Sequence, residues 1–144
     1  MAVYSATDYL TKPVPTHGDA NTMKAFYFEV ACAAAPSTAD TINFGYVPAN
    51  FRLLGATLEA TDMDTGGPTL TLNVGDAGSA TRLFSASTVA QAGTASSALA
   101  TTGQGYKYTA KTLITGIAQA NATTPAAGTI WLVLTGIQED STTS

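Results

Sequence analysis

The sequence predicts an all-β domain, a jelly-roll-like sandwich of about eight antiparallel strands. Several stretches of the 144-residue chain alternate apolar and polar residues with a period of two, which is typical of half-buried strands. Turn-forming Gly, Pro, Asn and Asp separate these stretches at intervals of about ten residues. No stretch of useful length has a helical period. These observations favour a sandwich or barrel, with a jelly roll as first choice and an immunoglobulin-like sandwich as the alternative.

The stretch from Phe51 to Asp76 shows this pattern most clearly. It predicts one strand at Phe51–Thr61 and another at Thr69–Asp76, joined by the turn-rich segment Asp62–Pro68. In the second strand the apolar residues share one face: Leu70, Leu72 and Val74. The joint is either the turn of a hairpin or a corner where the chain passes between two sheets.

Five further strands are expected: Lys24–Ala33, Thr41–Val47, Tyr106–Tyr108, Thr112–Ala120 and Thr129–Ile137. Period two places these side chains on one face of their strand: Phe26, Phe28, Val30 and Cys32 in the first; Ile42, Phe44 and Tyr46 in the second; Leu113, Thr115 and Ile117 in the fourth. The period of two is weakest in Thr81–Ala100, and we expect this segment to leave the sheets as a long excursion that contains one helical turn.

The strand at Thr129–Ile137 is almost continuously apolar, which indicates burial on both faces. One face would belong to the core. The other face carries Trp131 and Val133, and it would need a cover from the N-terminal arm or from a neighbouring subunit.

Three segments are expected: an extended N-terminal arm at residues 1–23, the sandwich domain at residues 24–138 and a short tail at residues 139–144. The arm has no strong period, and Pro13 and Pro15 favour an extended path. It either packs on its own domain or lies against a partner, and the sequence leaves both possibilities open.

The composition indicates a protein that forms lasting contacts. Only 11% of the residues are charged, and the net charge is -4. Such a weakly charged surface suits contact with copies of the chain or with another protein, although a Thr-rich monomer is the alternative. The six Lys and Arg residues form no basic stripe, which argues against nucleic acid as a partner.

Other classes of protein find no support in the sequence. No apolar run approaches the roughly 18 residues of a membrane helix, and the N-terminus lacks the features of a signal peptide. Cys32 is the single cysteine, so no internal disulfide can form, and we expect it in the core. His17 is the single histidine, and no nucleophile elbow, phosphate-binding loop or cysteine pair is present. We therefore expect no enzyme, no cofactor and no metal.

Two groups of carboxylates are candidate sites. Asp62 and Asp64, with Asp76 downstream, offer oxygen ligands of the kind that Ca²⁺ takes, but the spacing of a calcium loop is absent, and a solvated turn is favoured. Glu29 and Glu59 would form a glycosidase pair only if they faced one cleft, and we expect them on solvated outer faces.

Part of the chain resembles a known family. The segments VPANFRLLG, DMDTGGPTLTLNVGD, AGSATRLFSASTVAQAG, GYKYTAKT and AAGTIWLVL are similar to decoration, or cement, proteins of tailed bacteriophages. The resemblance covers Val47 to Ile137 and leaves out the N-terminal arm. It implies a jelly-roll-type domain, often trimeric, that binds outside the major capsid shell at junctions between capsomers and braces it against internal DNA pressure. It contains no active site.

The resemblance therefore implies a structural virion protein on the outer surface of the capsid, made in the host cytoplasm. Its partners would be the major capsid protein and copies of itself in a homotrimer, with no nucleic acid and no membrane. The residues expected at these interfaces are Tyr4, Tyr9, Leu10, Val14, Trp131 and Val133.

The alternative is a head-fibre or tail-tip module that recognises host glycan, with Tyr106 and Tyr108 as candidate sugar contacts, although packing within a strand is the favoured role of these two residues. An enzyme, such as a jelly-roll hydrolase or a cupin, is disfavoured because a cupin metal site needs several histidines.

Overall fold

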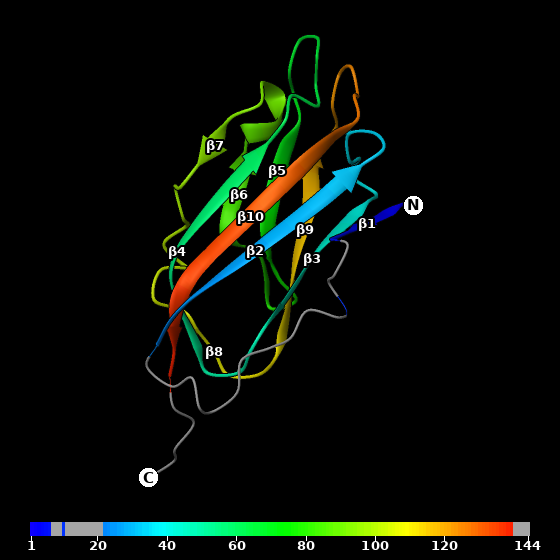
Figure 1. Cartoon of the computed structure of the whole chain (residues 1–144). Helices are drawn as coiled ribbons and strands as arrows, with labels where there is room; N and C mark the ends of the chain where they lie inside the picture. Colours follow the sequence, from blue (N-terminus) through cyan, green and yellow to red (C-terminus); the bar gives the residue numbers. More distant parts are fainter. Residues whose placement is uncertain (7–9, 11–21, 140–144) are drawn as a thin grey trace.

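The computed structural model describes residues 1–6, 10 and 22–139 of the chain, and these form two β-sheets packed face to face (Figure 1). The strands are β1 (Val3–Ser5), β2 (Thr22–Cys32), β3 (Thr41–Val47), β4 (Phe51–Ala60), β5 (Thr71–Asp76), β6 (Ser79–Ser87), β7 (Ala95–Ser96), β8 (Lys107–Tyr108), β9 (Thr112–Ala120) and β10 (Gly128–Gln138).

The strand order is that of a jelly roll. One sheet has the order β1-β3-β9-β5-β6, and the other has the order β2-β10-β4-β7, with β8 also paired to β4. We call them the β9 sheet and the β10 sheet after their central strands. The antiparallel pairs β2–β10, β3–β9 and β4–β7 join early strands to late ones, and the consecutive strands β5 and β6 form the closed end, as in a folded-over hairpin. The predicted fold class is confirmed.

The predicted arm contributes to the sandwich at its first residues. Strand β1 pairs with the edge strand β3, and this pair is parallel, so the β9 sheet is mixed. The Ala6 side chain is buried, and the Ala2 N–H donates to the Asp40 carboxylate at 2.7 Å. Residues 1–6 therefore pack on their own domain.

Both sheets bury one face in a common core. In β2 the buried and exposed residues alternate as predicted, with Phe26, Phe28, Val30 and Cys32 inside. Complete burial of a large apolar side chain stabilises the fold by about 1.5–3 kcal/mol. Cys32 is 3% exposed and belongs to the core, as predicted, and this burial raises the pKa of its thiol to about 11.

Bulges change the predicted face of some side chains. In β3 the pairing register shifts between Asn43 and Gly45, so Val47 is fully buried while Tyr46 is only half-buried. The prediction that Tyr46 shares a face with Ile42 was wrong for this reason. A Cβ atom at Gly45 would overlap the Phe28 ring of the opposite sheet, so the bulge also lets the two sheets approach closely.

In β9 the predicted strand has the correct bounds, but its core face is the opposite parity. Ile114, Gly116 and Ala118 are buried, whereas Leu113, Thr115 and Ile117 are half-buried on the outer face.

The segment 81–100 is more ordered than the sequence suggests. Its first residues belong to β6, a nine-residue strand, so the prediction of a long excursion was wrong there. The predicted helical turn is present as a 3₁₀ helix at Val89–Gln91. The pairing of β6 with β5 shifts register twice, which interrupts the period of two by which strands are read.

Strand β4 lies in the β10 sheet and β5 lies in the β9 sheet. The segment between them is therefore a corner between the sheets and not a hairpin turn, which was the other possibility. The interpretation of this segment as a solvated turn was wrong for Asp64, which is only 1% exposed. Its Oδ2 accepts the N–H groups of Thr69 at 2.7 Å and Leu70 at 3.0 Å. Its Oδ1 accepts those of Thr123 at 2.9 Å and Thr124 at 3.0 Å.

The Asp64 carboxylate therefore joins the β4–β5 corner to the loop between β9 and β10. Burial acts to raise the pKa of Asp64, but the four backbone N–H donors outweigh it and leave the pKa below its ordinary value. Both oxygens are occupied by N–H donors, so Asp64 is a structural acceptor and not a ligand for a cation.

We predict that Asp64→Ala lowers the melting temperature by roughly 10 °C, because four backbone donors lose a charged acceptor. Asp62→Ala is the matched control, since Asp62 is exposed and its carboxylate accepts one backbone N–H among the described residues, that of Asp64 at 3.1 Å. It should change the melting temperature much less. Thermal unfolding followed by circular dichroism measures both, and equal losses would contradict the role given to Asp64.

Stability should also fall in acid. Because the pKa of Asp64 is lowered in the folded protein, its contribution is complete above the ordinary aspartate value of 3.8 and is lost as the pH falls through the folded value. The pKa values of Asp40, Asp76 and Glu139 are also lowered, so they share the loss. Urea unfolding at a series of acidic pH values should show a shallower decline for Asp64→Asn than for the wild type. Parallel declines would show that Asp64 contributes nothing.

Candidate interaction surface

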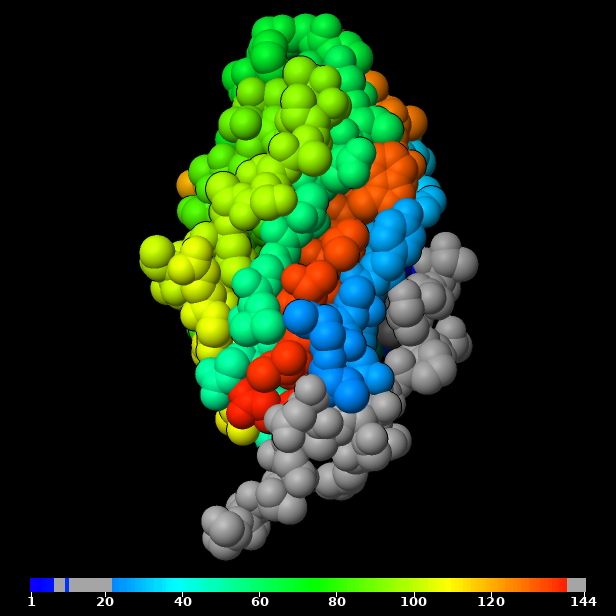
Figure 2. Space-filling model, turned by 60° about the vertical axis from the view of Figure 1, so that its left-hand side comes forward, coloured from blue at the N-terminus to red at the C-terminus, as the bar shows by residue number. Residues whose placement is uncertain are grey.

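The outer face of the β10 sheet is the main candidate surface. Figure 2 shows it, with the orange atoms of β10 between the blue atoms of β2 and the green atoms of β4. On β10, Trp131 and Val133 alternate with core residues and are half-buried. Large apolar side chains flank β10 on both neighbouring strands: Met23 and Tyr27 on β2 are 67% and 51% exposed, and Leu54 on β4 is 50% exposed.

A cross-strand row of polar and aromatic residues lies at one end of this face. Trp131 pairs in register with Glu29 of β2 on one side and with Glu59 of β4 on the other. In the next row, Val133 lies between Tyr27 and Thr57. A shallow hollow of about 130 Å³ is lined by Tyr27, Thr57, Glu59, Trp131 and Val133. The hollow therefore combines two aromatic rings with a carboxylate and a hydroxyl.

Tyr27, in the row next to that of Trp131, is hydrogen-bonded to Glu29. The Tyr27 hydroxyl donates to the Glu29 carboxylate at 3.1 Å. Desolvation and the neighbouring Glu29 raise the pKa of Tyr27, and a hydrogen bond from the Trp131 indole acts in the opposite direction. Tyr27 is thus a neutral phenol held between Trp131 and Glu29.

The residues predicted at interfaces are not all brought together. Trp131 and Val133 are adjacent on the outer face of β10, and Tyr4 lies on β1 at the edge of the β9 sheet, half-buried against the core. Leu10 is 69% exposed. Tyr9 and Val14 lie outside the described residues.

The sequence missed Tyr27, Met23 and Leu54 as surface candidates. Period two in β2 would have found Tyr27 on the face opposite to Phe26 and Phe28. Leu54 had no such signal, because it is the extra residue at a bulge where β4 shifts register against β10.

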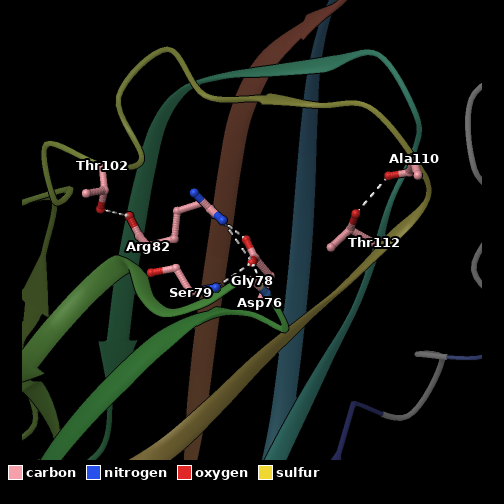
Figure 3. A network of polar contacts seen from close by, with 7 residues as sticks. All are labelled: Asp76, Gly78, Ser79, Arg82, Thr102, Ala110 and Thr112. Carbon is pink, nitrogen blue, oxygen red and sulfur yellow. Dashed lines mark hydrogen bonds and ion pairs between the residues drawn. The ribbon is translucent and has the colours of Figure 1, made fainter.

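Tyr106 and Tyr108 do not form an exposed platform for sugar. Tyr108 is 2% exposed, and the two rings pack edge to face with centroids 4.9 Å apart. The Arg82 guanidinium lies 3.7 Å from the centre of the Tyr106 ring. Its Nε donates to the Asp76 carboxylate at 2.5 Å (Figure 3). These residues close the end of the sandwich, so Tyr106 and Tyr108 pack in the domain, as the favoured interpretation had it, and the alternative of exposed sugar contacts finds no support.

Asp76, Glu29 and Glu59, which are candidate ligands or catalytic groups in the sequence, do not form such sites in the structure. Asp76 accepts the N–H groups of Gly78 and Ser79 as well as the guanidinium of Arg82 (Figure 3). Glu29 and Glu59 are exposed on the outer face, as expected, with Trp131 between them. In the described part of the chain, no three His, Cys, Asp or Glu side chains are grouped so as to hold a metal ion. Among the same residues, no helix is long and apolar enough to cross a membrane.

Similar chains occur in bacteriophage capsids. A chain in the capsid asymmetric unit of cyanophage Pam1 is 44% identical, the match covers 91% of this chain and 95% of that chain, and the TM-score is 0.74. A chain in the capsid of Ralstonia phage GP4 is 30% identical, with coverages of 96% and 99% and a TM-score of 0.81. This protein belongs to the same family of bacteriophage capsid proteins.

This capsid protein is therefore a structural component of the virion, in agreement with the predicted class. A chain in the acid-stable capsid of the Helicobacter pylori bacteriophage KHP30 shares the fold alone, at 12% identity and a TM-score of 0.52. No protein-family model and no curated protein matches the chain. The 96% coverage shows that the similarity to the GP4 chain extends well beyond the stretch from Val47 to Ile137.

The two faces of β10 should respond differently to truncation. Leu132 is fully buried in the core, and Leu132→Ala should destabilise the capsid protein by about 2–5 kcal/mol. Val133 is its neighbour on the outer face, and Val133→Ala should cost less than about 1 kcal/mol. Urea unfolding compares the two variants. A larger loss for Val133→Ala would mean that the outer face belongs to a core of the isolated chain.

Proposed function

We propose that this capsid protein is a decoration protein, which binds the outside of the major capsid shell as a trimer and stabilises the head. The observation that carries the proposal is the distribution of exposed apolar side chains. Among the described residues, the large ones fall into two groups: Met23, Tyr27 and Leu54 on the outer face of the β10 sheet, and Met1, Val3 and Leu10 near the N-terminus.

Such a distribution suits attachment to a preformed surface. A subunit that builds a closed shell contacts neighbours on several sides, whereas a decoration protein needs one docking face and a segment that anchors it. Exposed apolar groups gathered on one face of an otherwise polar domain are typical of an interaction site. The similarity to chains of phage capsids and the resemblance to decoration proteins support the same assignment.

Selective binding to the assembled shell would explain how this protein stabilises it. A protein that binds the assembled shell and not its free subunits shifts the equilibrium toward the assembled state. Three copies joined around a symmetry axis would engage three equivalent sites at once, so modest contacts add through multivalency. The low charge of the chain, 11% of residues, limits repulsion between closely spaced copies.

The proposal is tested with capsids purified from phage that lack the gene for this protein. The purified protein should cosediment with them, occupy the outer surface in cryo-electron microscopy maps and raise the temperature at which the heads release DNA. Light scattering after size-exclusion chromatography should give the mass of a trimer. Density inside the shell or at the tail, or heads with unchanged thermal stability, would contradict the proposal.

The glycan-binding alternative loses its main support, because Tyr108 is buried and Tyr106 packs against Arg82.

A further inference from the structure

The row Glu29–Trp131–Glu59 has the chemistry of a site for a cationic side chain. The two glutamates pair in register with Trp131 from opposite sides, so their Cα atoms lie about 10 Å apart, two strand spacings. Both are exposed, and no ion pair joins either of them to a basic side chain of the described residues. Two carboxylates thus stand on either side of an indole without a described cation to balance them.

Among basic side-chain groups, a guanidinium matches the two carboxylates and the indole of this row best. It is attracted by the face of a tryptophan ring, and its planar set of N–H donors matches a carboxylate. Lysine carries the same charge but stacks less well on an aromatic ring. The hollow beside Trp131 has Glu59 and Thr57 as acceptors and Val133 as an apolar wall. It is therefore suited to an arginine that enters from another molecule.

A second copy of the chain is a poor source of this cation. The basic residues in the described part of the chain are already engaged: Arg52 and Lys107 pair with Glu139, Arg82 pairs with Asp76, and Lys111 lies 4.6 Å from the centre of the Tyr46 ring. Lys24 has an interaction of its own. Two copies that met through this face would also bring acidic rows together, and like charges at an interface are unfavourable.

We infer that the outer face of the β10 sheet docks on the capsid shell by receiving a basic side chain, an arginine by preference, of the major capsid protein between Glu29, Trp131 and Glu59. This inference rests on the proposed decoration function and names the chemistry of the contact. The Tyr27 ring and Val133, in the adjacent row, shield it from water and complete the contact.

The first experiment measures binding of the full-length protein to capsids that lack it, at several salt concentrations. Glu59→Gln keeps the shape of the side chain and removes its charge. We expect about tenfold weaker binding and a shallower salt dependence, because a charged partner in the interface loses its pair. Asp62→Asn is the matched control, since it removes one exposed carboxylate at the sheet corner, and its binding should equal that of the wild type.

The second experiment uses the isolated protein. Trp131 is the single tryptophan of the chain, so its fluorescence reports on the row directly. A tetra-arginine peptide should produce a saturable change in emission, and a tetra-citrulline peptide, which is uncharged and of similar shape, should not. The response should be lost in the double variant Glu29→Gln/Glu59→Gln, whose fold is checked by circular dichroism.

The outcomes separate the two proposals. If the wild type binds capsids and Glu59→Gln binds equally well, the inference is overturned and the decoration function stands. If the wild type does not bind capsids, the decoration function fails, and the inference about the major capsid protein fails with it even if tetra-arginine binds. If Glu59→Gln instead weakens self-association in light scattering, the cation comes from a second copy and the inference is wrong. An emission response to a neutral oligosaccharide and not to tetra-arginine would also overturn it.

Discussion

The buried carboxylate of Asp64 is the interaction on which the arrangement of the two sheets depends. It accepts N–H groups from the β4–β5 corner and from the loop between β9 and β10. These two loops connect the inner strands of the sandwich, because β4 pairs with β10 in one sheet and β5 pairs with β9 in the other. By joining the loops, Asp64 holds together the two connections through which the chain passes from one sheet to the other.

The fold was predictable from the sequence where strands are regular. Strand β2 alternates without interruption, and its inner and outer residues follow directly from parity. Prediction failed at bulges, since an extra residue in β3 moves Tyr46 out of the core face, and two register shifts conceal β6. The position of a bulge depends on tertiary packing. At Gly45, for example, the Phe28 ring of the opposite sheet occupies the space that a Cβ atom would need. The local sequence pattern does not indicate such contacts between the two sheets.

The candidate surface was predictable only in its centre. Continuous hydrophobicity of β10 indicated a second apolar face, and Trp131 and Val133 do lie on it. The row was not predictable, because Glu29, Trp131 and Glu59 are far apart in sequence and meet only through the register of β2 and β4 with β10. The sequence also suggested Asp64 as a possible calcium ligand. A short acidic side chain in a loop has the same local signature whether it binds an ion, meets water or accepts backbone N–H groups.

Buried and half-buried residues alternate along β10, so the residues that stabilise the fold differ from those on its outer face. Its inward residues, Ile130, Leu132 and Leu134, are fully buried and hold the sheets together, whereas the intervening outward residues are half-buried. Because successive side chains of a strand point to opposite faces, the outer face can change its partner without disturbing the core. The inner face tolerates only changes that keep its volume. For the proposed docking of this outer face on a capsid shell, such independence lets the face match one particular shell while the fold stays the same.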